Sequence, residues 1–298
     1  MQRAENISAI FDQMLSKMES LNCGFEEAAQ RMVDWVNKTP DFLDLVDSIG
    51  CIPESIGHDS TSEKLFAKVS DAVLSRGFRE LGLKSIVLAE RGDSGDVHAE
   101  SKIFGYSLVA DAKAFRLSRT AKNQKDYKIV ALSNWRKDAD YAVLCAPYFQ
   151  YPNTKSQIYQ QSLTENVFLF SWEHLSFMLR SNIKESFDLN LSNLWNWPNS
   201  HLKVTMGDRL KECYLQSQDD FIVDLTKTTK LEFDRHMQMR IAALKERGGK
   251  EVNYWVEQIE EVKSLTREEA IQQLINARKM NSKIETIKSY VNGLEYGA

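Results

Sequence analysis

The spacing of apolar residues changes twice along this 298-residue chain, and that change limits the folds that the chain can adopt. Over residues 5–80, apolar side chains recur every three or four positions, which predicts amphipathic helices. Over residues 85–170, short runs of β-branched and aromatic residues alternate with turns, which predicts strands. Beyond residue 198 the helical spacing returns. We therefore expect a β-sheet between two helical regions.

The expected elements place the chain in the α/β class, with a mixed central sheet flanked by helices. Strands are expected at 85–89, 95–98, 105–115, 141–149 and 166–170. Helices are expected at 5–20, 25–36, from Ser60 to the turn at 81–83, at 124–136, after Ser171, at 206–217, 219–243 and 251–259, and from Thr266 onward. Ser60 with Glu63 and Thr266 with Glu269 have the spacing of capping boxes. We expect one domain, 1–298, with a helical N-terminal region (1–82), a sheet core (83–180) and a helical C-terminal region (181–298).

The composition excludes several classes of protein. A chain of this length with 43% hydrophobic residues can bury a large core without disulfide or metal cross-links. Its four cysteines lie far apart and form no Cys-x-x-Cys pair, so neither a zinc ribbon nor a disulfide framework is expected. Residues 1–20 lack an apolar signal core, and no apolar run reaches 18 residues. We therefore expect a cytoplasmic protein with no membrane partner.

Positive charge is concentrated in one segment of an otherwise acidic chain. Residues 101–136 carry eight basic and two acidic residues, a net charge of +6, so the remainder carries −10. A compact basic surface binds polyanions, while the surrounding negative field limits non-specific adhesion. A solvated, charge-rich loop without such a partner is the alternative interpretation.

Two residues suited to catalysis lie in this basic segment. Asp111 and Lys113 follow an apolar run on an expected strand, where residues two apart point to the same face. A carboxylate can hold a hard cation such as Mg²⁺, and a neighbouring ammonium can orient a water or offset phosphate charge. This pattern suits phosphodiester hydrolysis. The same spacing from acid to lysine occurs at Glu100, Asp126 and Glu261, so the motif is weak without its strand.

Acidic residues also precede the neighbouring expected strand. Glu90 and Asp96 lie in the glycine-containing stretch that leads into it. A carboxylate from one strand and an Asp-x-Lys from the next would form a two-carboxylate clamp for a metal ion. Capping of the turn beside Gly95 is the alternative role for Asp96.

Longer motifs resemble a known family. They are Arg-Gly-x-x-Gly-Asp-Val at 91–97, Leu-Val-Ala-Asp-Ala-Lys at 108–113 and Phe-Arg-Leu-Ser-Arg-Thr-Ala-Lys-Asn-Gln-Lys-Asp at 115–126, with shorter matches at 140–144, 149–152, 170–175 and 282–287. Here the chain resembles the HindIII restriction endonuclease family of the PD-(D/E)XK nucleases, and residues 1–80 and 176–265 agree more loosely.

The resemblance implies a restriction-endonuclease-like core and a homodimeric type II restriction enzyme. Such an enzyme uses one or two Mg²⁺ ions per active site to cut double-stranded DNA at a short palindrome. The resemblance points to AAGCTT, cut after the first A to leave 5′ overhangs and 5′-phosphates. It also implies a separately encoded DNA methyltransferase as the functional partner.

The same resemblance assigns the active-site residues. Asp111 and Lys113 match the Asp and Lys of the superfamily motif, and Asp96 matches its first acid. Gly95 stands where the superfamily usually has proline, so Glu90 remains a rival or an additional acid near the metal. Asp96, Asp111 and the carbonyl of Ala112 would hold the metal, and Lys113 would orient the attacking water.

The segment that follows the catalytic strand is rich in side chains that read base edges. Asn or Gln can bond to adenine, Lys or Arg to guanine, and Ala can contact a thymine methyl group. The candidate DNA-binding residues are Arg116, Arg119, Ala121, Lys122, Asn123, Gln124, Lys125 and Asp126. We assign the two arginines to phosphate contacts. Asp126 is left open between metal, DNA and its own helix, and a flexible basic loop is the alternative for the whole segment.

Two other functions remain open on the sequence alone. One is a repair or junction-resolving nuclease of the same fold, which would lack specificity for a short palindrome. The other is a non-catalytic DNA-binding protein in which Asp111 and Lys113 form a structural ion pair. The aromatic segment 195–198 is likewise open between a dimer interface and a buried helix junction.

Overall fold

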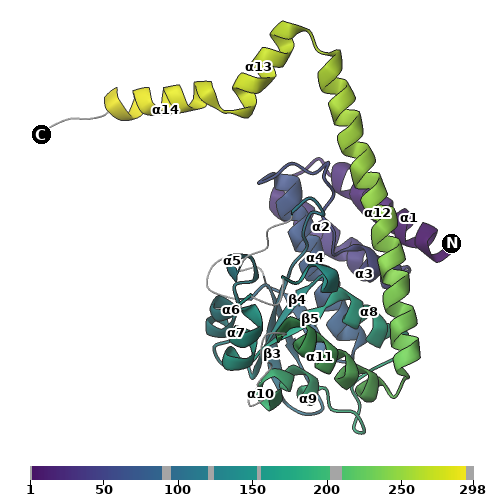
Figure 1. The fold of residues 1–298 in the computed structure, drawn as a ribbon. Helices are drawn as coiled ribbons and strands as arrows, with labels where there is room; N and C mark the ends of the chain where they lie inside the picture. The colour runs from purple at the N-terminus through teal and green to yellow at the C-terminus, as the bar shows by residue number, and fades with distance from the viewer. Residues whose placement is uncertain (1, 89–94, 120–123, 153–155, 202–209, 293–298) are drawn as a thin grey trace, which may run out of the picture. The chain divides into compact units, whose positions relative to one another are not determined.

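The structure, a computed structural model, describes residues 2–88, 95–119, 124–152, 156–201 and 210–292 (Figure 1). Its helices are α1 (Gln2–Glu19), α2 (Phe25–Lys38), α3 (Phe42–Ser48), α4 (Thr61–Glu80), α5 (Gln124–Tyr127), α6 (Ile129–Trp135), α7 (Ile158–Glu165), α8 (Trp172–Arg180), α9 (Ser192–Trp195), α10 (Trp197–His201), α11 (Leu210–Thr226), α12 (Lys230–Ser264), α13 (Arg267–Ala277) and α14 (Met280–Asn292), with a short 3₁₀ turn at Tyr148–Gln150. The chain divides into two compact units, Met1–Gly248 and Gly249–Ala298, which are described separately. The expectation of a single domain stays a prediction.

One mixed sheet forms the centre of the first unit. Its strands are β1 (Lys84–Val87), β2 (Val97–Glu100), β3 (Ser107–Ala112), β4 (Tyr141–Ala146) and β5 (Val167–Ser171), and they lie side by side in chain order. The pairs β1–β2 and β2–β3 are antiparallel, whereas β3–β4 and β4–β5 are parallel. The predicted α/β class, the mixed sheet and all five expected strands are confirmed.

Burial follows from the way helices cover this sheet. Every residue of β5, and all but the first of β4, is buried, as expected for parallel strands that are covered on both faces. Helix α4 packs against β1, β2 and β3, and α6 packs against β3, β4 and β5 (Figure 1). The ends of β2 and β3 are therefore fixed by packing on α4.

Helix α4 begins and ends where the sequence indicates. The hydroxyl of Ser60 accepts a hydrogen bond from the backbone N–H of Glu63 at 3.0 Å, while the carboxylate of Glu63 accepts one from the N–H of Asp59. The helix ends before Gly82, whose φ of +96° favours glycine. Gly77 allows α8 to come close, because a Cβ there would lie 2.7 Å from a methyl carbon of Leu175. The capping box at α13 is complete, with both reciprocal bonds present.

The prediction of one helix over 124–136 is wrong, because the chain forms two helices there. Lys128 adopts a left-handed conformation with φ of +48° and separates α5 from α6. In a continuous helix, residues two apart point in nearly opposite directions. The break lets both Tyr127 and Ile129 be buried, and the Tyr127 hydroxyl donates to the carbonyl of Gln150 at 2.8 Å.

The boundaries of the C-terminal helices also differ from the prediction. Helix α11 continues to Thr226 and so includes the first residues of the helix expected at 219–243. Helix α12 begins at Lys230 and contains the rest of that segment together with the helix expected at 251–259. The turn between them contains Lys227 with φ of +53°, and the hydroxyl of Thr229 accepts from the N–H of Glu232 at 3.2 Å. Local capping at Thr229 therefore begins α12 later than apolar spacing alone indicates. Helices α3 and α7 were not expected.

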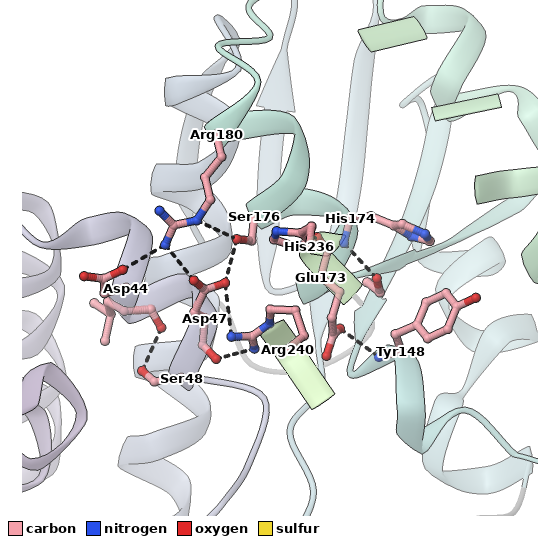
Figure 2. A network of polar contacts seen from close by, with 12 residues as sticks. Asp44, Asp47, Ser48, Tyr148, Glu173, His174, Ser176, Arg180, His236 and Arg240 are labelled. Carbon is pink, nitrogen blue, oxygen red and sulfur yellow. Dashed lines mark hydrogen bonds and ion pairs between the residues drawn. The ribbon is translucent and has the colours of Figure 1, made fainter. Parts of the chain in front are cut away.

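A buried ion-pair network joins α3, α8 and the first half of α12 (Figure 2). The side chain of Asp47, which is wholly buried, accepts from Ser176 at 2.6 Å and from Arg180 at 2.6 Å. Arg240 approaches the same carboxylate at 3.1 Å and also donates to the carbonyl of Asp47. One carboxylate thus ties α12 to two helices that lie far from it in the sequence.

Two other expectations can be compared with the structure. Trp195 and Trp197 are fully buried, which confirms the helix-junction interpretation of 195–198 and excludes a solvent-exposed interface there. All four cysteines are free thiols. In the described part of the chain, no helix is both long and apolar enough to cross a membrane.

Candidate active site

Asp96 and Asp111 lie at the neighbouring ends of β2 and β3. The ladder ends with Val97 opposite Ala110, and the N–H of Asp96 donates to the carbonyl of the same Ala110 at 3.1 Å, so Asp96 lies beside the end of β3 that carries Asp111. Gly95 makes this approach possible, because a Cβ there would lie 3.1 Å from the Cβ of Val109. Proline also carries a Cβ, so glycine suits this contact better than the proline that is usual in the superfamily.

Asp111 and Lys113 form an ion pair at the end of β3. Asp111 is 2% exposed, and its carboxylate contacts the Lys113 ammonium directly. The backbone of Lys113 is fixed on both sides: its N–H donates to the carbonyl of Cys145 at 2.7 Å, and its carbonyl accepts from the indole N–H of Trp172 at 2.9 Å. This anchoring holds the ammonium beside the carboxylate.

Burial and neighbouring charges determine the ionisation of this pair. Burial raises the pKa of Asp111 above its usual value, and the Lys113 ammonium opposes that rise only in part. Burial by itself would lower the pKa of Lys113, but the carboxylates of Asp111 and Asp96 raise it. Lys113 is therefore held as a cation, the form that can stabilise charge on a phosphate.

Helix α4 adds two residues that the sequence analysis did not include. The Lys68 ammonium lies 3.3 Å from a carboxylate oxygen of Asp71 and 3.3 Å from one of Asp96. Asp71 is 3% exposed, and Leu74 and Phe78, which lie one and two turns further along the helix, are fully buried. Asp71 lies on the same face of the helix as these apolar residues. A charged residue on an otherwise apolar helix face was the sequence signal that could have identified Asp71.

The carboxylates of this site interact with one another. Burial raises the pKa of Asp71 well above its usual value, and the nearby Asp96 and Asp111 carboxylates raise it further. For Lys68, burial opposes the charged form, but the carboxylates of Asp71 and Asp96 raise its pKa. The site thus collects three carboxylates and two ammonium groups from β2, β3 and α4.

The remaining acid-to-lysine pairs have other partners. Glu100 bonds to Lys84 at 2.7 Å, and Asp126 pairs with Arg119. Lys263 pairs with Glu260 at 2.7 Å on the exposed face of α12. Among the four motifs that share this spacing, the Asp111 motif is thus the one whose own acid and lysine contact each other in the described structure.

The expected DNA-binding segment is anchored at its start. Arg116, 15% exposed, pairs with Glu63 of α4 and donates to the carbonyl of Ile56 at 2.6 Å. Ser118 donates to the carboxylate of Glu54 from its N–H at 3.0 Å and from its hydroxyl at 2.9 Å. The Arg116 guanidinium therefore fastens the segment to α4, and its assigned phosphate contact would require it to leave Glu63.

An ion pair joins two residues of the same expected segment. Arg119 contacts Asp126. Gln124 and Lys125 lie in α5, which begins at Gln124 as expected. Glu90, Ala121, Lys122 and Asn123 lie outside the described residues. Ala112 is the last residue of β3, directly between Asp111 and Lys113.

Comparisons with known proteins give the family. The model of the HindIII restriction endonuclease family matches residues 27–291. The chain is also 46% identical over 287 residues to the type II restriction enzyme HindIII of Haemophilus influenzae, an alignment that covers 95% of this chain and 96% of that one. The motifs around Asp96, Asp111 and Lys113, from which the sequence resemblance was drawn, lie inside the matched region. The chain belongs to the HindIII restriction endonuclease family.

Proposed function

We propose that this chain is a metal-dependent type II restriction endonuclease. It would hydrolyse phosphodiester bonds in double-stranded DNA at the palindrome AAGCTT, after the first A, and leave 5′ overhangs with 5′-phosphates. The observation that carries the proposal is the buried Asp111–Lys113 ion pair beside Asp96, in a chain of this family. The 46% identity to a type II restriction enzyme supports the site-specific reaction.

The donor atoms suit a hard divalent cation. Three carboxylates lie at this site, and Ala112, whose carbonyl is a further oxygen donor, stands between Asp111 and Lys113. Oxygen ligands are those that Mg²⁺ prefers. We propose that Asp96, Asp111 and the carbonyl of Ala112 hold one or two Mg²⁺ ions, with Glu90 as the alternative or additional acid. When bound, such an ion lowers the pKa of a water and neutralises charge on the leaving oxygen.

The protein's own groups supply orientation and charge. Lys113, fixed by Cys145 and Trp172, is positioned to orient the attacking water and to stabilise negative charge on the phosphate. Asp111 keeps that ammonium in place. No covalent enzyme intermediate is required, and the buried His174, which bonds to Asp219 at 2.8 Å, belongs to the core.

We assign base reading to residues 121–125 and phosphate contacts to Arg119, with Arg116 joining them once it leaves Glu63. Replacing Asn123 by alanine is expected to reduce discrimination at one base position by about 1–3 kcal/mol. The measurement is the cleavage rate on all single-base variants of the site. Equal loss of rate on every variant would instead identify Asn123 as a backbone contact.

The apolar surface of the second unit supports a homodimer. Its large apolar side chains are 38–62% exposed and repeat at helical spacing, namely Val252, Trp255, Val256, Ile259, Val262, Ile271, Leu274, Met280, Ile284, Ile287 and Val291. A two-fold dimer would also match a palindromic site. We propose that a second copy of the chain covers this surface.

The dimer can be tested with one matched pair of variants on α12. Ile259→Glu is expected to raise the dimer dissociation constant by about tenfold or more, because it places a charge in a buried apolar contact. Asn253→Glu, which adds the same charge at an exposed polar position, is expected to leave it unchanged. Sedimentation velocity over a range of concentrations measures both. Equal behaviour of the two variants would place the interface elsewhere.

Digestion of a long, fully sequenced DNA with Mg²⁺ and with EDTA tests the reaction. Discrete Mg²⁺-dependent fragments with 5′ ends within AAGCTT are expected. Ends at another palindrome would keep the mechanism and revise the base-reading residues. Scattered ends would favour the repair or junction-resolving nuclease, and intact DNA that is still bound would favour the non-catalytic binding protein. We also propose a cytoplasmic location and a separately encoded methyltransferase that protects the same site.

A further inference from the structure

Lys68 joins the active site from outside the motifs that define it. Its ammonium lies at equal distances, 3.3 Å, from Asp71 on its own helix and from Asp96 beside β2. Asp71 precedes a buried turn of α4, and its side chain is 5% exposed, whereas the side chain of Asp96 is 39% exposed. The Lys68 ammonium therefore bridges one enclosed carboxylate and one that is open to solvent.

The two contacts differ in how easily they can be exchanged. Asp71 lies three residues after Lys68, so the helix itself keeps these two side chains together. Asp96 belongs to a different element, and its contact depends on where the Lys68 side chain points. Both contacts measure 3.3 Å, longer than the 2.7–2.9 Å of a strong charge-assisted hydrogen bond, so the contact that the helix does not hold in place, the one to Asp96, is the one open to exchange.

The charges in the site also favour exchange. Asp71, Asp96 and Asp111 face Lys68 and Lys113, and Lys113 is already held by Asp111. An ammonium on Asp96 occupies the oxygen that a divalent cation would use and repels that cation. A pocket of about 310 Å³, lined by Lys68, Gln30, Asn37, Ser75 and Arg79 among others, lies beside the side chain. It provides room for the ammonium to turn away from Asp96.

We propose that Lys68 is an internal counter-ion of the active site, which releases Asp96 but keeps Asp71 when a divalent cation binds. The inference rests on the proposed metal site at Asp96 and Asp111. Lys68 is then a positioning residue: in the metal-free protein it holds the acid beside β2 against α4, and it competes with the metal for that acid. Its presence lowers the affinity of the site for metal.

The test uses Ca²⁺ as the probe and the unfolding temperature of the full chain as the readout. Lys68→Met removes the charge and keeps most of the length, whereas Lys64→Met removes an exposed charge one turn earlier on α4. We expect Lys68→Met to lower the unfolding temperature without Ca²⁺ and to shift the midpoint of its Ca²⁺ dependence to about tenfold lower concentration. Lys64→Met and Lys68→Arg should keep the midpoint of the wild type.

A purely structural role for Lys68 would lower the unfolding temperature at every Ca²⁺ concentration without moving the midpoint, and that result would overturn the inference. The amino resonance of Lys68 in the wild-type chain, assigned by its loss in Lys68→Arg, gives a second measurement that needs no destabilised variant. It should shift as Ca²⁺ is added, and a fixed resonance would also overturn the inference. If Asp111→Asn leaves the Ca²⁺ dependence of the wild type unchanged, the proposed metal site fails instead.

Discussion

Replacing Asp111 by asparagine is expected to lower the rate of DNA cleavage by about a thousandfold or more, with binding of the target DNA retained. Asp111 is a proposed metal ligand, and it also keeps the Lys113 ammonium in place. Asparagine has nearly the same shape but no charge, so it removes both functions without opening a cavity. Arg116 and Ser118, at the start of the proposed DNA-contacting segment, are anchored by Glu63 and Glu54 rather than by Asp111.

Two measurements check this result. Cleavage is followed with Mg²⁺, and binding of an AAGCTT duplex is followed by fluorescence anisotropy with Ca²⁺. Asp138→Asn, which removes an exposed carboxylate shortly before β4, should cleave and bind like the wild type. If Asp111→Asn lost DNA binding together with cleavage, Asp111 would also be needed for DNA binding or for folding, beyond its proposed catalytic role. Cleavage near the wild-type rate would contradict the assignment outright.

Replacing Asp47 by asparagine is expected to lower the free energy of unfolding by about 3–5 kcal/mol. The Asp47 carboxylate is the shared partner of Arg180 and Arg240, and all three are joined in the network of Figure 2. Without its charge, the largely buried Arg240 loses this carboxylate, and Arg180, which is 23% exposed, keeps Asp44 as its partner. Urea unfolding at neutral pH measures the change in midpoint at constant slope.

Asp44→Asn is the matched control for Asp47. Asp44 contacts the same Arg180 at 2.8 Å, but its side chain is 19% exposed. Because solvent screens such a pair, its loss should cost about 1 kcal/mol or less. Equal costs for the two variants would mean that burial does not determine the strength of this network.

The effect of Asp47 should also depend on pH. Burial by itself would raise its pKa, but the charges of Arg240 and Arg180 and the hydroxyl of Ser176 bring it below the ordinary value of 3.8. The stabilisation is therefore complete above pH 3.8 and is lost as the pH falls through the lower pKa of the folded state. The difference in free energy of unfolding between the wild type and Asp47→Asn should be constant from about pH 5 to 8 and should become smaller in stronger acid. A difference that grew on acidification would contradict this sign.

Local patterns in the sequence predicted most of the secondary structure. The five strands and the long helices were found because periods of two and of about 3.6 residues are properties of the backbone itself. The prediction was wrong over 124–136, where Tyr127 and Ile129 are both buried at the expense of a continuous helix. Tertiary packing decides where such a helix breaks, so the local spacing of apolar residues does not predict the break.

The active site was only partly accessible from the sequence. Asp111 and Lys113 could be identified because they lie two residues apart at the end of one strand, where alternation brings them to one face. The pairing of β2 with β3 then brought Asp96 beside the end of β3 that carries Asp111. Asp71 and Lys68 were missed because they lie on a different element from Asp96. Lys68 precedes Asp96 by 28 residues, and no sequence motif links the helix to that acid.

The sequence by itself determined the class of fold, the succession of the strands and the long helices, the spacing of Asp111 and Lys113, and the family. These depend on periodicity, on short spacings and on motifs that are read along the chain. Only the tertiary structure decided which charges meet: Lys68 with Asp96, Arg116 with Glu63, and Asp47 with two arginines 133 and 193 residues away. Ion pairs between distant residues form where packing brings their elements together, and that packing depends on the whole core rather than on any one segment.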